Sequence, residues 1–149
     1  MDDLKLLLDD HTLLSSSVIH VVALVRRLAA GRFEATALPL ETARQAEQLR
    51  EQLVQHFEFE EVTAFPRLET LFPAHQEALR QFVAQHDGIL ETLEILCTEL
   101  SHDQPSDPRS LQKRALAFER VFEAHATAET TLFNEFASEL SGDAKTGFG

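Results

Sequence analysis

The sequence of 149 residues lacks several residue types, and each shortage excludes a class of protein. A single cysteine, Cys97, excludes an internal disulfide and a thiolate-rich zinc or iron–sulfur site. With only 5 Gly and 5 Pro, the chain has few of the residues that many-turned β structure requires. Trp and Tyr are absent, and Phe, at 11, is the main aromatic residue. The remaining composition is rich in strong helix formers, so we expect one helical domain.

Positive charge is also scarce, because 13 Lys and Arg stand against 25 Asp and Glu, for a net charge of -12. Nucleic acids and anionic membranes both attract basic surfaces, so we expect no nucleic-acid partner and no membrane partner. The acidic start Met1-Asp2-Asp3 lacks the basic residues and apolar run of a signal peptide. We therefore expect a cytoplasmic protein, of unknown oligomeric state.

Apolar residues recur at alternating steps of three and four along four stretches, which is typical of helices that share a core. The stretches run roughly from Leu4 to Ala30, Leu40 to Leu71, Ala74 to Leu100 and Arg109 to Leu140. Short connections separate them. We therefore predict an all-α protein, an antiparallel up-down-up-down four-helix bundle over residues 1–141. Residues 142–149 are predicted to form a flexible C-terminal tail.

Gly and Pro mark where these helices should end or bend. Gly31 should end the first helix, and Phe72-Pro73 should form the turn into the third. Ser101 to Pro108 is rich in Ser, Asp and Pro and is predicted to be a loop. In the second stretch the core-facing positions are expected to continue as far as Thr63, and Pro66 should kink the helix or end its regular part.

Six polar residues occupy core-facing positions where the pattern otherwise places apolar side chains. They are His11, His56, Glu60, His86, His125 and Glu129. Within the pairs His56/Glu60 and His125/Glu129, a spacing of four residues places both side chains on one face of a helix. Counted from the expected helix ends, all six lie toward the same end of an antiparallel bundle. We therefore expect them to form one layer.

Two buried carboxylates require positive charge, and no Lys or Arg occupies a core-facing position at this depth. A metal would supply that charge. Six imidazole and carboxylate groups are too many for one tetrahedral zinc, and the absence of thiolate disfavours soft metals. The set therefore predicts a pair of iron or manganese ions, with the two carboxylates bridging the ions and the four imidazoles at the two ends.

The other histidines do not fit this layer. His20 is about half a turn out of phase with the core-facing positions, and His102 falls in a predicted loop, so we expect both in solvent. His75 is separated from His86 by about 16 Å along a helix at the standard rise, too far to share the site. Glu61 lies off the core-facing positions and could act as an outer partner of the site.

The ordered set of motifs resembles the hemerythrin-like, or HHE cation-binding, family over roughly residues 4–140. The matching segments are Asp10-His11-Thr12-Leu13, His56 to Glu60 followed by Glu61 and Phe65-Pro66, Gln85-His86-Asp87, and His125 to Glu129 before Leu132-Phe133. The resemblance implies a four-helix bundle with two iron ions in an oxo- or hydroxo-bridged, non-haem di-iron centre. By position, it implies four terminal ligands and two bridging carboxylates, namely His11, His56, His86, His125 and Glu60, Glu129.

The chain departs from the oxygen-carrying hemerythrins on the third helix. Those proteins have a closely spaced pair of His there, whereas Phe82 and Leu90 stand four residues on either side of His86. The last motif also ends in Glu129, where the carriers have Asp at a slightly longer spacing. The layout is closer to bacterial HHE proteins that are linked to oxygen, peroxide or nitric oxide response and to iron handling.

We therefore expect a protein that binds or senses oxygen, or a related small ligand such as peroxide or nitric oxide, at a His/Glu centre inside the bundle. One alternative is a di-iron enzyme that consumes peroxide or nitric oxide. Another is an iron-handling or iron-donating protein. Haem ligation by His in a Phe-lined bundle is disfavoured by the two core-facing Glu residues. No catalytic residue is predicted.

Overall fold

The structure, a computed structural model, describes residues 2–31, 37–101 and 107–146. These residues are almost entirely helical, and they contain no β-strand. In chain order the elements are α1 (Asp2–Ala29), α2 (Ala37–Phe59), the π-helical turn η1 (Glu60–Ala64), α3 (Phe65–Leu71), the 3-10 turn η2 (Pro73–His75), α4 (Gln76–Leu100) and α5 (Pro108–Thr146). The all-α class predicted from the sequence is confirmed.

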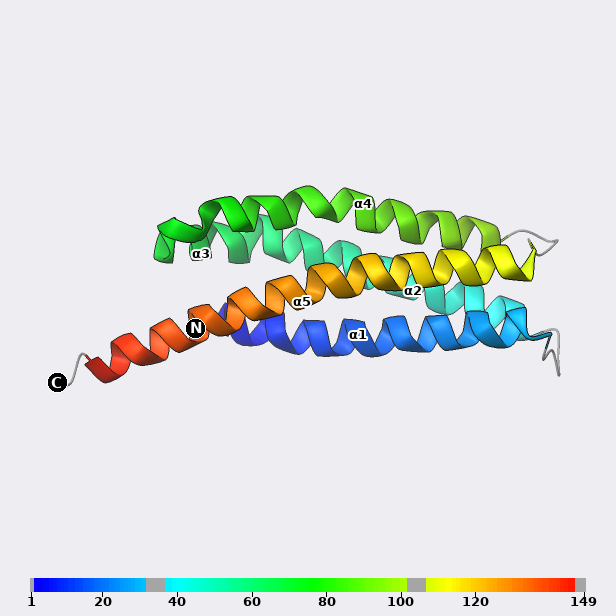
Figure 1. Cartoon of the computed structure of the whole chain (residues 1–149), viewed down its shortest axis with the longest axis horizontal. Coiled ribbons are helices and arrows are strands. Elements are labelled where there is room, and N and C mark those ends of the chain that lie inside the picture. The colour runs from blue at the N-terminus through cyan, green and yellow to red at the C-terminus, as the bar shows by residue number, and fades with distance from the viewer. Residues whose placement is uncertain (1, 32–36, 102–106, 147–149) are drawn as a thin grey trace.

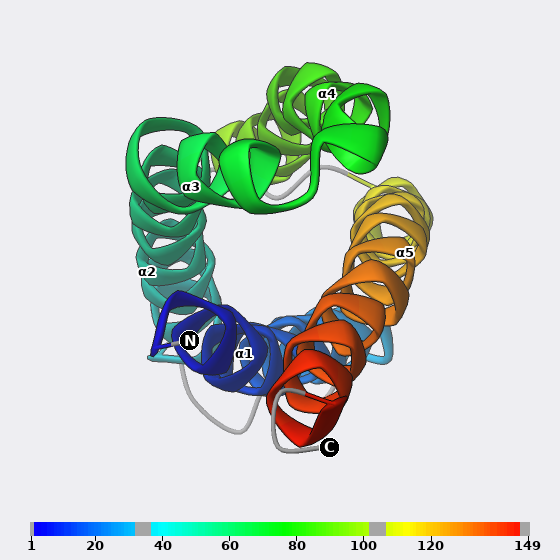
Figure 2. The same ribbon diagram turned by 90° about the vertical axis from the view of Figure 1, so that its left-hand side faces the viewer.

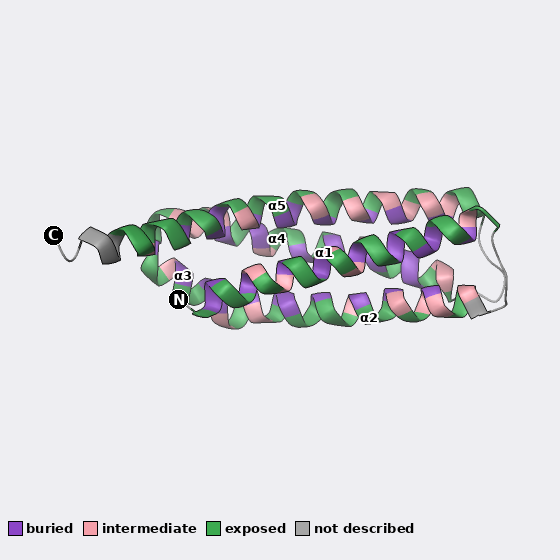
Figure 3. Ribbon diagram, turned by 90° about the horizontal axis from the view of Figure 1, so that it is seen from below, coloured by how far each residue is buried: buried purple, intermediate pink, exposed green. Residues whose placement is uncertain are grey.

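The long helices lie side by side around one elongated core, as Figure 1 and the end-on view in Figure 2 show. α1 contacts α2 and α5, and α4 also contacts α2 and α5, which closes the ring. The start of α1, the short α3 and the C-terminal part of α5 lie at the same end of the molecule. Buried residues follow the inward face of each helix in Figure 3, as the amphipathic pattern predicts.

The expected ends of the first helices are confirmed. Gly31 follows α1 with φ of 69°, a left-handed conformation in which Gly avoids the steric cost of a Cβ atom. Its N–H donates to the Leu28 carbonyl at 3.1 Å and so satisfies one of the free carbonyls at the helix end. Phe72 is non-helical, and Pro73 opens η2. Of the predicted loop, residues 102–106 and with them His102 lie outside the described residues.

The second helical stretch contains a π-helical turn, η1, that the sequence analysis did not predict. The Phe65 N–H donates to the Glu60 carbonyl, five residues back, instead of four. Pro66 follows immediately, and in an α-helix its ring would clash with the carbonyl four residues earlier. The wider turn accommodates one extra residue. The core-facing position therefore falls on the buried Ala64, and the expectation for Thr63 is wrong, since Thr63 is only half-buried.

The core consists of two apolar clusters that are separated by a polar layer. The first apolar cluster includes Val18, Leu53, Leu93, Cys97 and Phe118. The second apolar cluster includes Leu7, Phe65, Leu79, Phe133 and Phe136. Burial raises the pKa of the Cys97 thiol to about 12, so this residue packs as a small apolar side chain and stays a thiol at pH 7.

By length and composition alone, α1 is apolar enough to cross a membrane, with a mean hydropathy of 1.4 in its most apolar window. Core helices of soluble proteins and signal sequences meet the same criterion. In this structure the buried residues of α1 lie in both apolar clusters, and they also include His11 of the polar layer. The packing of α1 against α2 and α5 accounts for the apolar residues on its inward face, whereas Leu6, Leu13 and Ile19 are exposed.

The last helix is longer than the sequence analysis predicts. α5 continues to Thr146, so residues 142–146 are helical, although a flexible tail was expected from 142 onward. Gly142 costs about 1 kcal/mol relative to Ala inside a helix. No Pro follows it, and one such residue does not end a helix that is already formed. The domain boundary at 141 stays a prediction, and residues 147–149 lie outside the described residues.

Candidate metal centre

The structure brings the six polar core-facing residues together in one layer between the two apolar clusters. α1 contributes one of them, α2 one, η1 one, α4 one and α5 two. Glu60 and Glu129 are 0% exposed, and none of the four His residues exceeds 5%. The layer lies where the antiparallel depth count placed it, and ligation by these residues stays a prediction.

Within the layer, the ligand atoms fall into two groups, in each of which all atoms lie within 4.8 Å of one another. The His11/His56 position consists of those two imidazoles with Glu60 and Glu129. The His86/His125 position consists of the other two imidazoles with the same two carboxylates. This is the arrangement that two cations require when they share two carboxylates and each takes two further imidazole ligands.

Each carboxylate lies between one imidazole of each position. Glu129 Oε1 is 3.1 Å from the Nε2 atoms of both His11 and His125. Glu60 Oε1 is 3.0 Å from His86 Nε2, and its Oε2 is 3.4 Å from His56 Nε2. All four imidazoles therefore turn Nε2 toward the centre of the layer, and both carboxylates can bridge.

The other ring nitrogen of each imidazole contacts an oxygen atom on a neighbouring helix. The Nδ1 contacts are His11 with Thr130 Oγ1 at 2.9 Å, His56 with Asp10 Oδ2 at 3.3 Å, His86 with Glu61 Oε2 at 3.3 Å and His125 with Gln85 Oε1 at 2.7 Å. Carboxylate and amide oxygens only accept hydrogen bonds, so in at least three of these contacts Nδ1 carries the proton and donates. Nε2 then presents a lone pair to the layer, which is the tautomer that binds a metal.

The centre of the layer therefore consists of acceptors that face acceptors. The four Nε2 atoms and the four carboxylate oxygens of Glu60 and Glu129 have no hydrogen-bond partner among the described residues. A buried polar atom without a partner costs about 1–3 kcal/mol. Cations would satisfy all of these atoms at once. The residues present thus fit a pair of metal ions, and imidazole with carboxylate suits iron or manganese.

Burial and mutual repulsion determine how these groups titrate. Burial raises the pKa of Glu60 well above its ordinary value, and the facing carboxylate of Glu129 raises it further. Burial lowers the pKa of His86 to about 3, so its imidazole is neutral at pH 7 and available to a metal.

The structure also places the residues that the sequence analysis kept out of the site. His20 is exposed on α1, as expected, and the half-buried His75 lies outside the layer, in η2. Glu61 also lies off the core-facing positions, but it was predicted as an outer partner of the site. Its carboxylate accepts a hydrogen bond from His86 Nδ1, as that prediction requires.

The sequence analysis missed three of the four Nδ1 partners, Asp10, Gln85 and Thr130. A signal for them exists in the chain, because every Nδ1 partner directly adjoins a site residue on its own helix. The adjoining pairs are Asp10-His11, Glu60-Glu61, Gln85-His86 and Glu129-Thr130. Each of these polar residues thus contacts an imidazole on a neighbouring helix. The hydrophobic pattern of a single helix does not show which neighbouring side chain such a residue contacts.

A buried layer of imidazole and carboxylate acceptors inside a helical bundle defines a class of protein, one that binds metal cations in its core. Consistent with this, the family model of the hemerythrin HHE cation binding domain matches residues 3–137. The chain belongs to this hemerythrin HHE family, as the motifs predicted. No curated protein and no solved structure matches the chain.

Proposed function

We propose that this chain is a non-haem di-iron protein that binds or senses oxygen, or a related small ligand such as peroxide or nitric oxide. The observation that carries the proposal is the set of buried Nε2 and carboxylate oxygen atoms that lack any donor. The His11/His56 position and the His86/His125 position would each take one iron ion, and Glu60 and Glu129 would lie between the ions. The proposal includes the antiparallel up-down-up-down topology, which the course of the chain in Figure 1 supports.

Bound iron would supply one-electron redox chemistry and an open coordination position for a small ligand. The protein's own contribution is to hold and orient the ligands. The Nδ1 contacts fix the tautomer and the ring orientation of each imidazole, which supports metal affinity. The apolar clusters above and below the layer keep bulk water away, and Phe57 and Phe133 lie directly against its imidazoles.

Metal analysis and the visible spectrum of the protein, purified without added metal, test this proposal first. We expect about two iron ions per chain and ligand-to-metal charge-transfer bands, in a near-ultraviolet region that is clear because Trp and Tyr are absent. Glu129→Ala should lose both, whereas Glu58→Ala, an exposed site on α2, should keep them. One zinc ion or no metal, with a spectrum indifferent to Glu129→Ala, would refute the proposal.

Oxygen, peroxide and nitric oxide, added in turn to the reduced and iron-loaded protein, distinguish binding from turnover. A stable spectral change that reverses when the ligand is removed supports binding or sensing. Sustained consumption of peroxide or nitric oxide would instead identify an enzyme that uses the same centre. Transfer of the iron to an apo acceptor protein would support an iron-handling role.

We propose further that the protein acts in the cytoplasm, with a small ligand as its partner and with neither nucleic acid nor membrane. The net charge of -12 supports this, because phosphate-bearing partners attract basic surfaces. The oligomeric state stays open and is measured by sedimentation of the iron-loaded chain.

A further inference from the structure

The two metal positions have the same types of ligand but different surroundings. At the His86/His125 position the rings are enclosed by Phe side chains. The Phe57 ring stacks on the His86 ring, with centroids 3.8 Å apart and planes only 7° from parallel. Phe57 and Phe82 each meet the His125 ring edge-on at 5.8 Å. A stacked ring blocks rotation, so these two imidazoles have little freedom to turn away from a bound ion.

At the His11/His56 position both imidazoles border open space instead. A groove of about 560 Å³ between α1 and α5 is lined by His11 and by its partner Thr130. A pocket of about 210 Å³ between α1 and α2 is lined by His56, Asp10, Leu14 and two Gln side chains. The Phe ring that contacts His11, Phe133, is tilted by 37° at 5.5 Å and does not stack. Neither imidazole is therefore enclosed as closely as His86.

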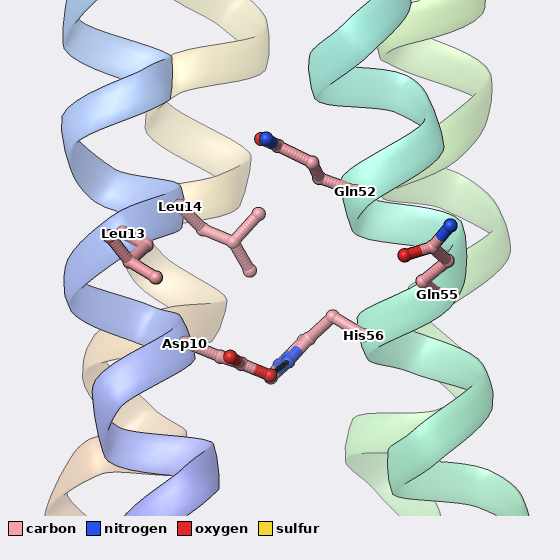
Figure 4. A pocket seen from close by; sticks show the side chains of 6 residues that line it. All are labelled: Asp10, Leu13, Leu14, Gln52, Gln55 and His56. Atoms are coloured by element: carbon pink, nitrogen blue, oxygen red, sulfur yellow. Dashed lines mark hydrogen bonds and ion pairs between the residues drawn. The ribbon is translucent and has the colours of Figure 1, made fainter.

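Figure 4 shows what holds His56 at the edge of this pocket. Asp10 on α1 and His56 on α2 point toward each other across the space between the helices, and the Asp10 carboxylate meets the imidazole. The Asp10 side chain is 42% exposed, so water competes for the oxygen that accepts from His56 Nδ1. When this hydrogen bond breaks, the imidazole can turn into the pocket and leave the centre.

The hydrogen bonds to Nδ1 are alike at the two positions. Glu61, whose side chain is 44% exposed, accepts from His86 Nδ1 at 3.3 Å, as Asp10 does from His56. The second contacts are also similar, at 2.7 Å between His125 and Gln85 and 2.9 Å between His11 and Thr130. The two positions thus repeat both the ligands and their Nδ1 partners, and they differ in the Phe rings that hold His86 and His125 and in the open spaces beside His11 and His56.

We propose that the two positions exchange metal unequally. The ion at the His11/His56 position leaves first and loads last, through the pocket between α1 and α2, and Asp10 is the positioning residue that keeps His56 turned inward. The ion at the His86/His125 position is retained because Phe57 and Phe82 hold its imidazoles in place. This inference rests on the proposed two-iron centre and adds an order of loading and release to it.

Release of ferrous iron to a coloured chelator, recorded under anaerobic conditions from the reduced iron-loaded protein, tests the inference. We expect two phases of one iron each in the unmodified protein. Asp10→Ala should accelerate the fast phase by about tenfold, since loss of such a partner typically weakens metal binding by about 10–100-fold, and should leave the slow phase unchanged. Asp10→Asn keeps an oxygen acceptor but removes its charge, so its fast-phase rate should fall between those of Asp10→Ala and the unmodified protein.

Phe82→Leu and Gln85→Ala are the matched variants at the other position, since Phe82 contacts the His125 ring whereas Phe57 also contacts the His56 ring at 5.9 Å. Both should accelerate the slow phase and leave the fast phase unchanged. A single phase that releases both ions in the unmodified protein, or an Asp10→Ala effect that is equal on the two phases, would overturn the inference. Far-ultraviolet circular dichroism of each variant verifies that the bundle is intact.

These outcomes are distinct from a failure of the proposed function. If the purified protein never holds two iron ions, the two-iron proposal fails before any release is measured. If it holds two ions that leave together, the di-iron proposal stands and only the inequality of the positions is wrong. Loading metal-free protein with one equivalent of ferrous iron gives a second test. The first ion should occupy the His86/His125 position, so Asp10→Ala should not weaken its binding.

Discussion

The polar layer and the apolar clusters beside it are formed by the same helices, yet they depend on different partners. In the apolar clusters each side chain packs against others of the same chain, so the packing is complete without a ligand. In the layer the buried acceptors face one another, and only a cation can satisfy them. The stability of the bundle and its capacity for metal therefore arise largely in separate regions, which meet where Phe57, Phe82 and Phe133 contact the imidazoles.

Truncation in the first apolar cluster should have the largest effect. Phe118 is 1% exposed, and Phe118→Ala should lower the free energy of unfolding by about 3–5 kcal/mol, through lost burial and a residual cavity. The loss should be equal with and without metal, because the ring neighbour of Phe118 is Phe122 and not an imidazole of the layer. Urea unfolding of both forms measures it, with Phe118→Leu as the milder control. A loss confined to the metal-loaded form would contradict the separation of the two regions.

Metal removal should have the next largest effect. With free metal at about one hundred times its dissociation constant, binding stabilises a folded protein by about 2.7 kcal/mol. The metal-free chain should therefore melt at a lower temperature while it remains helical, which calorimetry and circular dichroism record. Glu58→Ala, exposed on α2, should show the same difference between the two forms as the unmodified chain. Equal melting temperatures with and without metal would show that the layer holds no ion.

Glu60→Gln should separate stability from metal binding within the layer itself. In the metal-free protein this change removes a buried carboxylate and supplies an amide N–H₂ that can donate to Glu129, so unfolding should become about 1–2 kcal/mol less favourable. The same variant should gain much less stability from added iron. Chemical unfolding with and without iron measures both. If the metal-free variant is instead less stable than the metal-free unmodified chain, the buried Glu60 carboxylate does not destabilise the layer and the prediction is wrong.

The ion pair beside the second apolar cluster should have the smallest effect. Arg67 Nη1 lies 3.2 Å from Asp3 Oδ2, and the Arg67 side chain is 65% exposed. The Asp3 side chain is only 9% exposed, but the Arg67 end of the pair is open to water, so we expect a contribution of about 0–1 kcal/mol that salt screens. Arg67→Ala should therefore cost less than about 1 kcal/mol in dilute buffer, and still less at high salt. A salt-independent loss would show that Arg67 acts through packing of its aliphatic stem.

The predictions from sequence succeeded where one helix determines the outcome. The three-and-four spacing identified most of the buried positions, and the polar interruptions at His11 and His86 pointed to the layer because a buried imidazole requires a partner. Glu60 and Glu129 were identified in the same way on their own helices, and the antiparallel depth count then predicted one layer for all six residues. Each of these steps needs only the helical repeat and the cost of burying a polar group.

The features that were missed depend on contacts between helices or on a change in the repeat. Asp10 and Gln85 lie beside site residues, and on their own helices they resemble ordinary surface residues. Only the relative rotation of neighbouring helices shows that each reaches an imidazole. Thr63 was placed in the core because an unbroken α-helical repeat was carried through η1 toward Pro66. The extra residue of a π-helical turn leaves no mark in the hydrophobic spacing before it.

In genetic terms, η1 is equivalent to the insertion of one residue into a regular α-helix, and deletion of one residue should restore the regular helix. Deleting Thr63 would restore an ordinary α-helical count and would keep Ala64, Phe65 and Leu68 on the inward face. Pro66 would then lie inside a continuous helix, where it costs about 3 kcal/mol or more. The deletion and the proline thus constrain each other. A shorter relative with a regular helix at this point is expected to have replaced the proline as well.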